Sequence, residues 1–167
     1  MQAKPPLSGI RILDAATFLA APYAASLFSE YGAEVIKVEL PSGDHMREIG
    51  PFRGDVSLWW KVIARNRQSV TLDLNTEEGR DVFKQLAAKC DVVIMNYRPD
   101  ALKKWGLEFK DLVQCRSDII FYHLTAFGAG PYAQRPGFAR VAEAFAGLTN
   151  RTGFPGQPPV QSGYAML

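Results

Sequence analysis

Three short segments, rich in small or constrained residues, are the parts of the sequence best suited to contact a ligand. They read ATFLAAP (16–22), NYRPD (96–100) and TAFGAGP (125–131). Glycine and alanine let a backbone approach a ligand closely, and proline fixes the path of a turn. Each segment alone is also compatible with an ordinary tight turn. Their convergence on one edge of the fold would favour a binding site.

Basic side chains accompany these segments, namely Arg98, Lys103, Lys104 and Arg135. Guanidinium and ammonium groups bind phosphates, so together they are candidates for a phosphate-bearing ligand. Each one singly is also typical of a solvated surface charge. The formal net charge of only +2 favours neither a nucleic acid nor a membrane surface as a partner.

Several common sites are not supported by the sequence. Residues 13–18 read LDAATF, without the glycine pattern of a dinucleotide site, and no phosphate-binding P-loop pattern occurs. His45 and His123 have no motif spacing, and we expect His123 to be a satisfied core or edge residue. Cys90 and Cys115 are isolated, which excludes a metal-type spacing and favours a reducing compartment. No metal or permanently bound cofactor is therefore expected.

Carboxylates offer a further set of candidates: Asp14, Asp44 and Asp73. Asp14 is the most interesting because it ends a predicted strand. We expect it to have a structural role, such as holding the turn that follows. The stretch SGDH (42–45) holds Ser, Asp and His together, but adjacency in one loop does not make a catalytic triad.

Alternating strands and helices must position these residues. We predict strands over 9–16, 33–40, 68–74, 91–96 and 118–125, and helices over 22–32, 75–90, 99–106, 108–115 and 138–148, with a short helical turn near 57–66. Asn75 is predicted to cap its helix, whose apolar face would contain Val82, Phe83, Leu86 and Ala87. The runs 92–95 and 119–121 suggest strands covered on both faces. The fold class is therefore α/β, with a Rossmann-like, doubly wound and mostly parallel sheet.

Length and composition agree with this fold class. The 167 residues suit one domain, and 47% hydrophobic with 22% charged residues are ordinary for a globular protein. The N-terminus lacks the features of a signal or transit peptide. The longest apolar stretch, 15–28, is too short to cross a bilayer. We therefore expect a cytoplasmic protein without a membrane partner.

The combination of GAEVIKVELPSGD (32–44), NYRPD (96–100) and GPYAQRPGF (130–138) resembles the family III CoA-transferases of the CaiB/BaiF type. This group includes formyl-CoA transferase and carnitine CoA-transferase, and the resemblance covers nearly the whole chain. It implies a Rossmann-like, CoA-binding N-terminal portion of a longer chain, with coenzyme A or acyl-CoA and a small carboxylic acid as substrates. It also implies an interlocked homodimer of the full-length protein.

The resemblance carries CoA-contact roles onto individual positions. The residues concerned are expected near the CoA thiol end, the adenine, the nucleotide or the glycine loop. They are Leu19, Ala20, Leu40, Leu72, Asn96, Tyr97, Arg98, Lys104, Thr125 and Phe127. Three positions depart from the family pattern. Leu40 stands where several relatives have arginine, Asp100 replaces a glycine, and Ala139 replaces a common aspartate.

The resemblance also implies a nucleophilic aspartate that forms an acyl-enzyme intermediate. The family pattern places it five residues after the glycine that corresponds to Gly163, which is the first position after Leu167. No catalytic residue is thus expected within 1–167, and we expect this stretch alone to be inactive.

Two alternatives remain open. An α-methylacyl-CoA racemase of the same superfamily would need a histidine base after the glycine loop, where this sequence reads Gly137–Phe138–Ala139 and has no histidine. The other alternative is a non-catalytic module that binds CoA or a protein partner.

Overall fold

The computed structural model describes residues 4–163. The chain divides into two compact units, the first ending at Leu124 and the second beginning at Thr125. Along the described residues, no helix has both the length and the apolar composition needed to cross a membrane.

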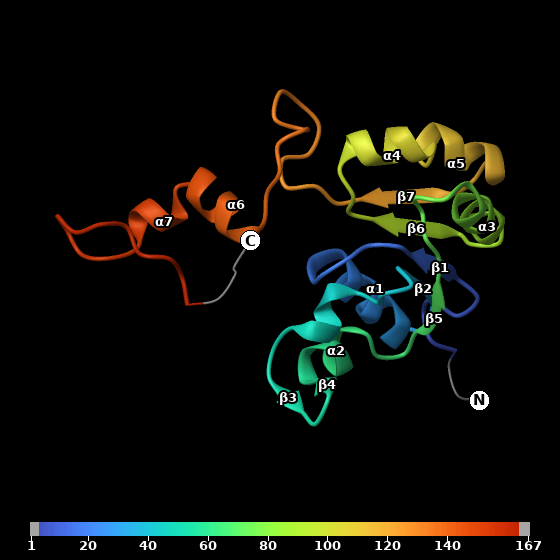
Figure 1. The fold of residues 1–167 in the computed structure, drawn as a ribbon, viewed down its shortest axis with the longest axis horizontal. Coiled ribbons are helices and arrows are strands. Elements are labelled where there is room, and N and C mark those ends of the chain that lie inside the picture. Colours follow the sequence, from blue (N-terminus) through green and yellow to red (C-terminus); the bar gives the residue numbers. More distant parts are fainter. Residues whose placement is uncertain (1–3, 164–167) are drawn as a thin grey trace. The chain divides into compact units, whose positions relative to one another are not determined.

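The first unit is built on a five-stranded parallel sheet (Figure 1). Its spatial order is β5-β2-β1-β6-β7. The strands are β1 (Arg11–Asp14), β2 (Glu34–Glu39), β5 (Gln68–Thr71), β6 (Val92–Met95) and β7 (Ile120–His123). All four pairings in this sheet are parallel. The predicted α/β fold with a parallel sheet is confirmed.

Helices cover both faces of the sheet. On one face, Ala21 and Ala25 of α1 (Ala20–Glu30) pack on Ile12 and Ile94. The other face is covered by α3 (Glu77–Ala87), α4 (Pro99–Trp105) and α5 (Phe109–Cys115). Because successive strand residues point to opposite faces, the neighbours Ile12 and Leu13 enter different cores. The sheet therefore separates two apolar layers.

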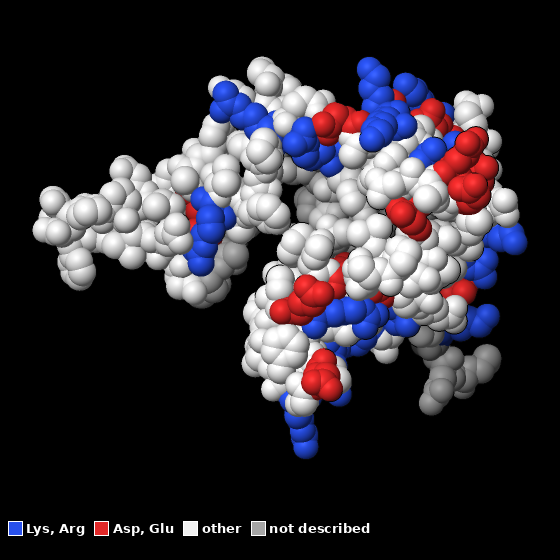
Figure 2. All heavy atoms as spheres, viewed as in Figure 1, with Lys and Arg blue, Asp and Glu red and all other residues white. Residues whose placement is uncertain are grey.

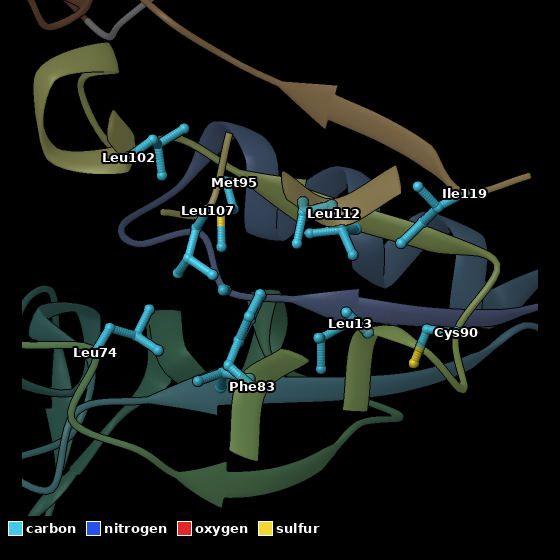
Figure 3. Close-up of a cluster of buried hydrophobic side chains, with 13 residues drawn as sticks. Leu13, Leu74, Phe83, Cys90, Met95, Leu102, Leu107, Leu112 and Ile119 are labelled. Atoms are coloured by element: carbon cyan, nitrogen blue, oxygen red, sulfur yellow. The ribbon is translucent and has the colours of Figure 1, made fainter. Parts of the chain in front are cut away.

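The larger apolar layer lies between the sheet and α3, α4 and α5 (Figure 3). Phe83 of α3 is fully buried there beside Leu13 of β1, with Leu102 and Leu112 from the two other helices. The predicted apolar face of α3 is correct at Phe83 and Ala87, but Val82 is exposed. The predicted N-cap is wrong by one residue, since Thr76 Oγ1, not Asn75, accepts the hydrogen bond from Gly79 N at 3.0 Å.

A long excursion separates β2 from β5, as predicted. It contains the 3₁₀ helix η1 (His45–Glu48), the antiparallel pair β3 (Phe52–Arg53) and β4 (Val56–Ser57), and the helix α2 (Leu58–Ile63). The sequence predicted the helical turn but not the hairpin. Ser57 caps α2 by accepting a hydrogen bond from Trp60 N at 3.2 Å.

The predicted burial of the last strand on both faces is wrong. Strand β7 is an edge strand, paired only with β6 among the described residues. Its alternate residues Ile120 and Tyr122 are 62% and 43% exposed. Phe121 and His123 point to the opposite face, where Phe121 packs against the larger apolar layer.

The second unit contains two short helices, α6 (Ala139–Phe145) and α7 (Leu148–Arg151). The sequence predicted one helix over 138–148. Gly147, with φ of 77°, ends the first helix and begins the second, because this backbone conformation interrupts a right-handed helix. Buried Glu143 of α6 accepts hydrogen bonds from Arg140 and from Ser162, both at 3.1 Å.

Candidate functional site

The carboxyl ends of β1 and β6 lie side by side, and the two predicted segments that follow them meet there. Thr17 N donates to Asn96 Oδ1 at 2.8 Å, and Asn96 Nδ2 donates to Thr17 O at 2.8 Å. The Asn96 amide thus bridges both backbone polar atoms of Thr17. Parallel α/β sheets bind ligands at this edge.

A surface hollow of about 510 Å³ lies beside this bridge, at the start of α4. Its walls contain four of the predicted contact residues, Asn96, Tyr97, Arg98 and Lys104, together with Asp100 and Ala101. All six residues follow directly after β6 or lie in the first two turns of α4, so they are close in space because they are close in the sequence. On the face shown in Figure 2, basic side chains gather over α4 with acidic ones beside them.

Tyr97 forms the apolar part of this hollow. Its ring packs edge-on against Trp105, with centroids 4.9 Å apart. Burial raises the pKa of the Tyr97 phenol to about 12, so it is neutral at physiological pH. The Tyr97 carbonyl lies 2.6 Å from His123 Nε2. His123 is therefore the satisfied edge histidine that the sequence predicted.

Arg98 is paired with Asp100, one of the three residues at which the sequence was expected to depart from the family pattern. Its Nη2 lies 2.5 Å from Asp100 Oδ2, and its Nε donates to Asp100 Oδ1 at 3.1 Å. Hydrogen bonding to Arg98 lowers the pKa of Asp100, which stays ionised. Both side chains are exposed. A ligand phosphate that binds Arg98 would compete with the Asp100 carboxylate.

The turn from β1 into α1 contains the predicted residues Leu19 and Ala20. Leu19 is the N-cap of α1 and has no side chain that caps the helix, while Ala20 is exposed. Phe18 has φ of 63°, which is rare for a bulky side chain. Its ring stacks on His45, with centroids 5.4 Å apart. Such strained positions cluster at functional sites.

The other predicted CoA-contact residues lie after β2, after β5 and in the second unit. Leu40 and Leu72 follow the neighbouring strands β2 and β5, and Leu72 N donates to Glu39 O at 2.8 Å. Leu72 also packs on the larger apolar layer. Thr125 and Phe127 belong to the second unit, where Thr125 Oγ1 accepts from Gly128 N at 3.0 Å. Phe127 packs edge-on against Phe145 at 5.2 Å.

Two cations buried under the β1–α1 turn, Lys37 and Arg67, were missed by the sequence analysis. Asp14 Oδ2 lies 2.6 Å from Arg67 Nη1 and 3.8 Å from Lys37 Nζ. Lys37 Nζ is also 3.2 Å from Asp44 Oδ2. Burial raises the pKa of Asp14, whereas the two cations lower it. Lys37 could have been found from its place in the strand EVIKVE, on the same face as buried Val35.

Asp14 has the structural role that the sequence predicted, because its Oδ1 accepts a hydrogen bond from Ala16 N at 3.0 Å. Next to it, Glu39 forms a second ionic cluster. Burial alone would raise the pKa of Glu39, but hydrogen bonds from Arg47, Ser69 and the Asp44 amide lower it to about 2. Arg47 contacts both Glu39 carboxylate oxygens, at 2.7 and 2.8 Å.

Within residues 4–163, no three His, Cys, Asp or Glu side chains are grouped as a metal would require. The site thus offers cationic groups, small-residue turns and apolar walls. The predicted nucleophile lies outside the described residues.

Comparisons with known proteins give one consistent result. The model of CoA-transferase family III matches residues 7–167. The alpha subunit of succinyl-CoA–L-malate CoA-transferase from Chloroflexus aurantiacus is 47% identical over 99% of this chain and 40% of its own length. Human succinyl-CoA:glutarate CoA-transferase is 40% identical over 96% of this chain and 37% of its own length.

Solved structures agree with these relatives. A CAIB/BAIF family protein from Brucella suis has a TM-score of 0.89 and 34% identity, over 98% of this chain and 45% of that one. A hypothetical protein from Mycobacterium tuberculosis also has a TM-score of 0.89, with 36% identity over 97% of this chain and 46% of that one. The chain therefore spans less than half the length of these relatives. It belongs to CoA-transferase family III.

Proposed function

We propose that this chain is the CoA-binding N-terminal part of an acyl-CoA:carboxylate CoA-transferase. The main observation in support is the hollow at the start of α4, which gathers Asn96, Tyr97, Arg98 and Lys104 beside the β1–α1 turn. The names of the relatives, which include an acetyl-CoA:oxalate CoA-transferase from Acetobacter aceti at 33% identity, support the same reaction class.

Each part of the site has a role in this proposal. Arg98 and Lys104 bind phosphates of CoA through charge-assisted hydrogen bonds. The apolar residues Leu40 and Leu72 lie toward the adenine. The backbone of Leu19 and Ala20 lies against the thiol end, where the small, exposed side chain of Ala20 leaves room.

The chemistry that we propose is covalent catalysis by an aspartate that follows Leu167. Its carboxylate attacks the thioester carbonyl of the donor acyl-CoA, the C–S bond breaks, and CoA leaves as the thiolate. The thiolate then attacks the enzyme carbonyl of the mixed anhydride and releases the donor acid. The acceptor carboxylate attacks the resulting enzyme thioester and expels the CoA thiolate, which gives a second mixed anhydride. Attack of this thiolate on the acceptor's carbonyl then forms the new acyl-CoA and releases the aspartate carboxylate.

In this proposal the donor is an acyl-CoA, the acceptor is a small carboxylic acid, and the whole protein is a cytoplasmic, interlocked homodimer. A binding module without catalysis would share the CoA site but not the exchange reaction. An exchange assay therefore separates the two proposals. In a polypeptide that continues past Leu167, we expect CoA exchange between acyl-CoA and a free acid, abolished when the proposed aspartate is replaced by asparagine. Persistent exchange after that replacement would exclude the covalent route.

The CoA site itself is tested by titration calorimetry of this chain with CoA. Lys104→Gln should weaken binding by about 3–10-fold, because one charge-assisted phosphate contact is worth about 1 kcal/mol at an exposed site. Lys103→Gln is the matched control: Lys103 is exposed on the same helix but does not line the hollow. Equal losses for both variants, or no binding by the unsubstituted chain, would contradict the proposed site.

A further inference from the structure

Two of the buried charges beneath the β1–α1 turn are neighbours in the sheet. Asp14 of β1 and Lys37 of β2 are register partners, so their side chains share one face. The side chains of Asp14 and Lys37 are 0% and 2% exposed, and that of Arg67 is 2% exposed. Burying four charged groups together, with Asp44, is costly and is often no more stable than an apolar core. The network therefore requires an explanation other than stability.

The contacts of this network converge on the backbone of one turn. Asp14 accepts from Ala16 N at 3.0 Å, and Lys37 Nζ donates to the Ala16 carbonyl. Both backbone polar atoms of Ala16 are thus bound by charged side chains. Arg67 donates to the Pro22 carbonyl in the first turn of α1, and also to Ser26 Oγ further along α1 and to the Ile63 carbonyl in α2.

The conformation between these two anchors is a strained one. Phe18 has φ of 63°, and a bulky residue holds such a backbone only where its surroundings impose it. Asp44 connects the network to the residue that stacks on the Phe18 ring. It pairs with Lys37 and caps η1 by accepting from Met46 N at 2.9 Å, and the next residue, His45, stacks on Phe18.

We infer that Lys37 and Arg67 are positioning residues, which hold the turn Ala16–Leu19 in the shape that receives the thiol end of CoA. This inference rests on the proposed function. Neither side chain reaches the ligand, because both are buried under the turn. Their substitution should therefore weaken CoA binding through the turn, beyond any effect on overall stability.

The test compares two variants with a control substitution on the opposite face of the sheet. Lys37→Met combined with Asp44→Asn removes one buried positive and one buried negative charge, which keeps the cluster balanced. Arg67→Lys keeps the charge but loses the planar fork that reaches several carbonyls at once. Phe83→Leu is the control, since Phe83 is buried in the apolar layer on the opposite face of the sheet.

Calorimetry with CoA would be performed where circular dichroism shows all the proteins to be folded, and amide NMR shifts would be recorded for Thr17, Phe18 and Leu19. We expect at least a 10-fold loss of CoA affinity for the double variant and several-fold for Arg67→Lys, with displaced amide resonances in the turn. Phe83→Leu should bind within 2-fold of the unsubstituted chain. If the double variant does not fold, Arg67→Lys decides the question.

Three results would overturn the inference. The first is CoA affinity within 2-fold of the unsubstituted chain in folded Lys37 and Arg67 variants. The second is an equal loss of affinity in Phe83→Leu, which would assign the effect to stability alone. The third is no CoA binding by the unsubstituted chain, which would also refute the proposed function, whereas the first two leave that function standing.

Discussion

Replacing Asn96 by alanine should destabilise the chain measurably, because its amide bridges the exits of β1 and β6. The substitution removes two hydrogen bonds of 2.8 Å and leaves the N–H and C=O of Thr17 without this partner. A buried polar group that loses its partner costs about 1–3 kcal/mol. Since Thr17 and Asn96 are only half-buried, water can replace part of the interaction, and we expect about 2 kcal/mol in total.

Urea denaturation followed by circular dichroism measures this cost. With a slope of about 2 kcal/mol/M, the unfolding midpoint of Asn96→Ala should fall by about 1 M. Asn75→Ala is the control, since the Asn75 side chain makes an exposed hydrogen bond to Asp73, and it should stay within about 0.5 kcal/mol. Equal midpoints for the two variants would refute the reasoning and show that the Asn96 bridge does not hold the strand exits together.

Three further predictions concern charge and packing. The pKa of Glu39, lowered from 4.5 to about 2, corresponds to at most about 3–4 kcal/mol. Solvent at the 44%-exposed Arg47 side chain reduces this to about 1–2 kcal/mol. Because the pKa of Glu39 is depressed in the folded state, this stability is present above about pH 4.5 and is lost as the pH falls toward 2. Glu39→Gln should therefore flatten this part of the pH dependence of the urea midpoint. Parallel pH curves for the variant and the unsubstituted chain would contradict this expectation. Asp100→Asn should free Arg98 and tighten CoA binding about 2–5-fold in low salt, measured by calorimetry, with weaker binding as the contrary result. Phe83→Ala should cost about 3–5 kcal/mol in urea unfolding because it empties a fully buried site, and a cost below about 1 kcal/mol would place Phe83 outside the core.

The sheet was predictable because its strands are short apolar runs separated by turn or helix signals. The position of each strand within the sheet was harder to predict from the sequence. Val92–Met95 and Ile120–His123 have similar apolar character, yet the first is central and the second is an edge strand with exposed Ile120. Periodicity reports which residues are apolar but not which strand lies next to which. The one-residue error at the α3 cap arose because Asn75 and Thr76 are both good capping residues.

The part of the candidate site that lies in one continuous segment was predictable from the sequence. Tyr97, Arg98 and Lys104 line one hollow because they belong to one strand exit and the helix that follows it. The buried network is different, since Asp14, Lys37 and Arg67 come from separate segments. Their contacts depend on the strand register and on the path of the excursion between β2 and β5, which no local pattern specifies.

The most direct test of CoA binding at the carboxyl edge of the sheet is an amide NMR titration of this chain with CoA. We expect the largest shift changes at residues 16–20 and 96–104, and small ones near Arg116, which pairs with Asp91 at the amino edge of the sheet. Shift changes centred on Arg116, or no changes at any CoA concentration, would contradict the proposed site.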